Sequence, residues 1–99
     1  MTPAARVQTA IELLDTIIAS ARAKGAPADR ILGDWFKQSR FAGSKDRRAI
    51  RELVYAAIRA CGPVPQNGRA AMLRLGQGDL SILPLFDGSN YGPAPIGAM

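Results

Sequence analysis

Arginine side chains recur with helical spacing in the middle of the chain, and a tyrosine lies among them. Each residue of a helix turns by about 100°, so side chains three or four residues apart share one sector of its surface. One narrow sector would hold four such side chains: Arg48, Arg51, Tyr55 and Arg59. The opposite sector is apolar and carries Ile50, Leu53, Val54 and Ala57. Arginine bridges phosphates through its planar fork and tyrosine stacks on unpaired bases, so this spacing predicts a helix with an RNA-binding side.

The excess of positive charge is confined to the same part of the chain. The net charge is +5, yet residues 1–36 and residues 60–99 each carry equal numbers of basic and acidic side chains. Residues 37–59 hold the whole excess, which is typical of a protein that binds a polyanion. We therefore extend the predicted RNA-binding surface, called the basic face below, to seven residues: Lys37, Arg40, Lys45, Arg48, Arg51, Tyr55 and Arg59.

A simpler interpretation of the same residues is a solvated helix surface. Arg48 and Glu52 are four residues apart, and such a pair stabilises a helix by about 0.3 kcal/mol without any ligand. Arg47 lies nearer the apolar sector, so we expect its stem to pack and its guanidinium to reach Asp29 or Asp34. The clustering of the surplus charge leaves both interpretations of the basic face open.

Residues suited to catalysis are scarce. The chain contains no histidine and a single cysteine, Cys61, which excludes an intrachain disulfide, the common zinc sites and the usual nucleophile–base pairs. Cys61 ends the apolar stripe of the central helix, so we expect a small core residue there. Trp35 and Phe36 lie on another apolar stripe and are also expected in the core. We predict no catalytic residue, no metal site and no bound cofactor in this chain.

Two helices are predicted before the basic segment. The first begins at Pro3, with Thr2 as its cap, and should end near Lys24-Gly25. The second begins near Pro27, and its apolar stripe extends to the two aromatic residues named above. Residues 40–43 are predicted to form the loop that leads into the helix with the arginines.

The helix with the arginines is predicted to start at Lys45, with Ser44 as its N-cap, and to stop at Gly62-Pro63. A short helix capped by Asn67 should follow and end at its glycines, Gly76 and Gly78. No segment alternates apolar and polar residues for long enough to indicate a strand. The sequence therefore predicts an all-α fold.

The last part of the chain is predicted to lose regular structure. Asp79 would cap one or two helical turns in residues 80–86, where Pro84 prevents a long helix. Residues 87–99 are mostly glycine, proline and small polar residues, so we expect them to be extended or disordered. We predict a helical domain at residues 1–86 and a linker or tail at residues 87–99. We also expect a cytoplasmic protein without a signal peptide or membrane span.

Three stretches of the chain resemble a known family. The run Gly43-Ser44-Lys45-Asp46-Arg47 followed by Leu53-Val54-Tyr55 is similar to the third helix of the NusB-like N-terminal domain of bacterial rRNA cytosine-5 methyltransferases. In that helix a G-S-x-D-R run precedes an L-V-Y segment. Two further stretches agree, the opening Pro3-Ala4-Ala5-Arg6 and the segment from Leu85 to Ser89 with Tyr91 to Pro95. The similarity thus extends over nearly the whole chain.

The resemblance implies a NusB-like bundle of about five helices with an extended C-terminal tail. In the family, this module binds RNA and precedes a Rossmann-like domain that uses S-adenosylmethionine to methylate carbon 5 of a cytosine. Neither the cofactor-binding motif nor the catalytic cysteines of that domain have counterparts here, and Cys61 does not match them. The implied partners are RNA, in particular rRNA, and the C-terminal methyltransferase domain of the same protein, and we expect the chain to be a fragment.

Two other functions remain open from the sequence. A protein-interaction module of the antitermination-factor type would expose an apolar patch, for which residues 80–86 are the candidate. A helix-turn-helix that reads DNA is less favoured, because the connection at residues 40–44 is longer than the usual tight turn.

Overall fold

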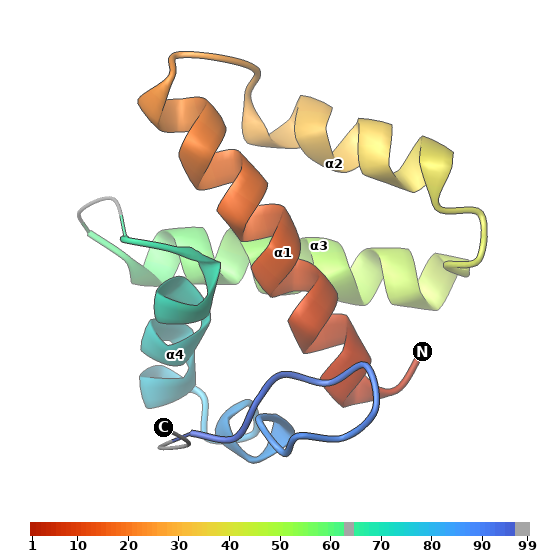
Figure 1. Cartoon of the computed structure of the whole chain (residues 1–99), viewed down its shortest axis with the longest axis vertical. Helices are drawn as coiled ribbons and strands as arrows, with labels where there is room; N and C mark the ends of the chain where they lie inside the picture. The colour runs from red at the N-terminus through yellow and green to blue at the C-terminus, as the bar shows by residue number, and fades with distance from the viewer. Residues whose placement is uncertain (63–64, 97–99) are drawn as a thin grey trace.

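The computed structural model describes residues 1–62 and 65–96, which form four α-helices and one 3₁₀ turn (Figure 1). The elements are α1 (Pro3–Arg22), α2 (Ala28–Gln38), α3 (Ser44–Ala60), α4 (Gly68–Gly78) and the 3₁₀ turn η1 (Leu83–Leu85). The described residues contain no strand, so the predicted all-α class is confirmed. About five helices were expected and four are found, because residues 80–86 form only the single turn η1.

Helix α1 is the central element of the fold. The Thr2 hydroxyl accepts a hydrogen bond from the Ala5 N–H at 3.1 Å, so Thr2 caps the helix as predicted, with Pro3 in the first turn. The helix buries Val7, Ala10 and Leu14 and packs against α2, α3 and α4. Figure 1 shows α1 crossing over α3, with α2 and α4 on opposite sides of the crossing.

Helices α2 and α3 run in opposite directions and are joined by the loop at residues 39–43 (Figure 1). Helix α2 buries Leu32 and Phe36, and α3 turns its apolar stripe of Ile50, Val54 and Ala57 into the core. The predicted cap of α3 is wrong by one residue. Ser44 is already in the first turn, and the N-cap is Gly43, which has no side chain to accept a hydrogen bond.

The ends of the last two helices agree with the sequence. Helix α3 stops at Ala60, just before the predicted glycine–proline stop, of which Pro63 lies outside the described residues. Asn67 caps α4, since its side-chain oxygen accepts a hydrogen bond from the Ala70 N–H at 2.8 Å.

No helix in the described part of the chain combines the length and the apolar character that crossing a bilayer requires.

Residues 87–96 differ from the extended or disordered tail that was expected. They contain no helix or strand, but they fold back over the start of α1, where Pro93 is fully buried (Figure 1). Arg69 on α4 fastens the segment: its guanidinium lies 5.0 Å from the centroid of the Phe86 ring and donates to the Pro95 carbonyl at 3.2 Å. The segment is therefore part of the packed fold. Proline and glycine exclude a helix there, but they do not prevent the segment from being buried.

Candidate nucleic-acid interface

The predicted cations of the basic face are exposed. Lys37 is in the last turn of α2, Arg40 is in the loop, and four more lie on α3: Lys45, Arg48, Arg51 and Arg59. The buried stripe of α3 faces α1, and the arginines of α3 are exposed on the rest of its surface. Arg59 also lines a hollow that includes Pro3 and Arg6 of α1. The fold thus places these exposed cations on three consecutive parts of the chain, α2, the loop and α3.

None of these cations is neutralised by a carboxylate in the described residues. The ion pairs found there are both made by Asp46, which accepts from Arg6 Nε at 2.8 Å and lies 3.5 Å from the N-terminal amino group. The Arg48–Glu52 pair of the simpler interpretation is not formed. The basic face therefore contains no ion pair within the described structure, although Glu52 and Asp79 line the same hollow as Arg59.

Asp46 connects the start of α3 to the start of α1. The hydrogen bond from Arg6 is the largest influence on the Asp46 carboxyl and lowers its pKa. Desolvation opposes this shift, and the N-terminal amino group lowers the pKa further. Asp46 lies in the first turn of α3, where the helix dipole also favours a negative charge. The acidic residue in the first turn of α3 is thus engaged by cations outside the basic face.

Arg47 does not reach the acidic residues expected for it. Its Nε donates to the Ala42 carbonyl at 2.9 Å, and its guanidinium lies 5.7 Å from the centroid of the Phe36 ring. Asp29 is in the first turn of α2, whereas Arg47 lies beside the last turn of that helix. The role of Arg47 is structural, as predicted, but it fixes the loop between α2 and α3 instead of forming an ion pair.

Two arginines of the basic face, Arg51 and Arg59, have other side chains close to them. The Arg51 guanidinium lies 5.4 Å from the centroid of the Phe36 ring, a cation–π distance, and the side chain remains exposed. Arg59 lines a shallow hollow at the other end of α3 together with Glu52 and Asp79. Asp79 is engaged by Ser81, whose hydroxyl donates to it at 2.6 Å and lowers the pKa of its carboxyl.

The aromatic residues are arranged differently from the prediction. Phe36 is buried as expected, Trp35 is half-buried, and Tyr55 is half-buried against the core. The exposed ring next to the basic face belongs to Phe41, which is 73% exposed and meets Trp35 edge-on at a centroid distance of 6.0 Å. Phe41 was not predicted as a functional residue, because a single aromatic residue in a short loop has no periodicity. Its position directly after Arg40 was the one available signal.

Cys61 is the C-cap of α3 and is half-buried against the core, so the core position predicted for it is confirmed in part.

The chemistry that the basic face offers is electrostatic attraction and stacking, because its groups are guanidinium and ammonium ions beside aromatic rings. Comparison with protein-family models, with curated proteins and with solved structures finds no match for this chain.

Proposed function

We propose that this chain is an RNA-binding module that holds RNA through the basic face. One observation supports it most: the exposed guanidinium groups of Arg48, Arg51 and Arg59 have no carboxylate partner among the described residues, although they follow one another along a single helix. Arginine forks match the geometry of phosphate oxygens, and closely spaced cations gain affinity by releasing counterions from the RNA.

We further propose that the module is NusB-like and serves an rRNA cytosine-5 methyltransferase, as the resemblance of residues 43–55 implies. The contacts of these residues support the proposal. Asp46 and Arg47 fix the first turn of α3 and the preceding loop, while Arg48 and Arg51 remain exposed. The module would position rRNA for a catalytic domain outside this chain.

S-adenosylmethionine would be bound by that separate domain. A dinucleotide or nucleoside fold of the Rossmann type holds its ligand at a glycine-rich turn that follows a strand. The described residues form no strand, and their glycines lie in helices and surface turns. The residues present therefore do not fit the cofactor, and the proposed contribution of this chain is RNA binding alone.

The test is a charge reversal with a matched control. The variant Arg48→Glu, Arg51→Glu, Arg59→Glu reverses the basic face, and the control Lys24→Glu, Arg30→Glu, Arg74→Glu makes the same change in net charge at exposed sites elsewhere. Affinity for a structured rRNA fragment is measured by fluorescence anisotropy, and folding by circular dichroism and thermal melting. The first variant should lose at least about tenfold in affinity with its helical spectrum intact. Equal losses in both triple variants would reject a localised interface.

A further inference from the structure

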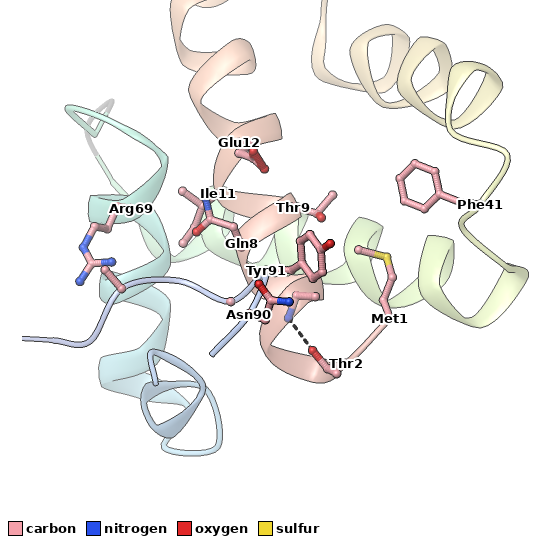
Figure 2. Close-up of a pocket in the computed structure, with 13 residues that line it drawn as sticks. Met1, Thr2, Gln8, Thr9, Ile11, Glu12, Phe41, Arg69, Asn90 and Tyr91 are labelled. Atoms are coloured by element: carbon pink, nitrogen blue, oxygen red, sulfur yellow. Dashed lines mark hydrogen bonds between the residues drawn. The ribbon is translucent and has the colours of Figure 1, made fainter. Parts of the chain in front are cut away.

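A groove of about 900 Å³ runs beside the N-terminal half of α1 (Figure 2), and no residue of the basic face lines it. Phe41, from the loop between α2 and α3, and Tyr91, from the folded-back segment, both line it. The polar side chains of Gln8, Thr9 and Asn90 lie between or beside these rings in Figure 2. The groove thus combines two aromatic rings with neutral hydrogen-bonding groups.

Both rings are held outward by ordered backbone. Tyr91 is 80% exposed and has a φ of 66°, a left-handed conformation that is unfavourable for a residue with a side chain. The turn that imposes it is closed by the Gly92 N–H, which donates to the Ser89 carbonyl at 2.9 Å. The loop of Phe41 is fixed by Arg47 through the Ala42 carbonyl. Because the backbone on both sides of the groove is already ordered, only the side-chain rotamers of the two rings remain to be fixed when a ligand stacks on them.

The polar residues of the groove are available to a ligand. The side chains of Gln8, Thr9 and Asn90 make no hydrogen bond in the described structure, and each can donate and accept. The edges of unpaired bases present donors and acceptors of the same kind. Glu12, which also lines the groove and is exposed, would repel a phosphate and can accept from an exocyclic amino group of a base.

The loop of Phe41 connects the groove to the basic face. Arg40 precedes Phe41 directly, and Lys45 follows in the first turn of α3, so exposed cations flank in sequence the residue that stands at one end of the groove. An RNA whose phosphates contact α3 would meet this loop next. This continuity, together with the cations at one end, favours nucleotides over an apolar peptide as the occupant.

We infer that the groove binds unpaired nucleotides of the RNA, with their bases stacked on Phe41 and Tyr91 and their edges read by Gln8, Thr9 and Asn90. The inference rests on the proposed function, since the basic face is what brings the RNA to the molecule. It assigns the module a preference for RNA with single-stranded loops over a continuous duplex.

The experiment compares two RNAs and three variants of the full chain. The RNAs are a hairpin whose unpaired loop carries 2-aminopurine and a fully paired duplex of the same stem. The variants are Phe41→Ala, Tyr91→Asn and the control Leu80→Ala. Asparagine is chosen at position 91 because it tolerates the left-handed backbone conformation. Leu80 is 75% exposed and lies outside the groove. Phe41→Ala and Tyr91→Asn should each bind the hairpin about tenfold more weakly and quench 2-aminopurine less, with unchanged binding to the duplex.

The outcomes separate the two proposals. If the unsubstituted chain binds neither RNA, the proposed function fails and the groove proposal fails with it. A second outcome overturns only the groove proposal. In it, the unsubstituted chain binds the hairpin and the triple arginine-to-glutamate variant of the basic face does not. Phe41→Ala and Tyr91→Asn, however, bind the hairpin as tightly as the Leu80→Ala control. If the two groove variants keep RNA affinity and instead lose self-association in gel filtration, the groove is a protein-docking surface. Melting temperatures identify any variant that fails to fold.

Discussion

The backbone N–H of Gly68 donates to the Oδ1 of Asp15 at 2.6 Å, which joins the first residue of α4 to the middle of α1. A Cβ at position 68 would overlap the Ile11 carbonyl oxygen and approach the Asp15 backbone. The two helices therefore meet backbone to backbone at this point, and a carboxylate occupies the positive end of the α4 dipole. This contact sets how closely α4 packs on the helix that also supports α3.

Substituting alanine for glycine should have opposite effects at two positions of the chain. Gly68→Ala forces α4 away from α1 and should lower the free energy of unfolding by about 1–3 kcal/mol. Gly33, within α2, has open space on the side where alanine would carry its methyl group, so Gly33→Ala should raise it by up to about 1 kcal/mol through helix propensity. Urea denaturation measures both. Equal effects at the two positions would show that the helices are not in close contact at Gly68.

Arg47 should stabilise the loop at residues 39–43 by its geometry as well as by its charge. Arg47→Lys keeps the charge and removes the Nε–H that donates to the Ala42 carbonyl, so we expect a loss of about 1 kcal/mol in stability. Amide hydrogen exchange in residues 40–43 should become faster. The matched control is Arg48→Lys, at an exposed position with no partner in the described structure, which should change neither quantity. Unchanged exchange in Arg47→Lys would contradict this role.

The Arg6–Asp46 pair should make stability depend on pH in the acid range. The pKa of Asp46 in the folded chain lies below its ordinary value of 3.8, chiefly because of the hydrogen bond from Arg6. The contribution of ionised Asp46 to the stability of the folded chain is therefore fully present above the pKa that its carboxyl has in the unfolded chain. This contribution is lost as the pH falls through the lower pKa of the folded chain. Asp46→Asn should be less stable than the parent at neutral pH, and the difference should shrink below pH 3.8. Thermal melts across this range check it, and a constant difference would contradict the assignment.

The folded-back segment should contribute to stability. A chain that ends after Phe86 loses the buried Pro93 and the hydrogen bond from Arg69 to the Pro95 carbonyl, and uncovers the start of α1. We expect it to be about 1–3 kcal/mol less stable than a chain that ends after Ile96, with similar helix content by circular dichroism. If both chains unfold at the same urea concentration, the segment does not contribute to the packed fold.

The local features of the helices were predictable because neighbouring residues determine them. Thr2 and Asn67 cap their helices through hydrogen bonds that span three residues, and the buried stripe of α3 follows from its spacing. The closing segment at residues 87–96 was not predictable in this way. Its proline and glycine content excludes regular structure, but whether such a segment packs depends on surfaces of α1 and α4 that are distant in sequence.

The candidate site shows the same division between local and tertiary information. Sequence spacing placed the arginines of α3 on one sector, and the structure shows them exposed. The spacing of residues could not predict that Arg47 would donate to the Ala42 carbonyl, since the path of the loop decides which acceptor is nearest. Phe41 and Tyr91 lie 50 residues apart in sequence and line one groove only because the chain folds back over α1.

The central proposal is that the arginines of α3 neutralise RNA phosphates, and the salt dependence of binding tests it most directly. If about four phosphates are contacted, the plot of log affinity against log salt should have a slope near −3 for the parent chain. Replacing Arg48, Arg51 and Arg59 by glutamine should make the slope shallower by about 2, whereas glutamine at Lys24, Arg30 and Arg74 should leave it unchanged. A slope that is the same for the parent and for both glutamine variants would contradict the proposal.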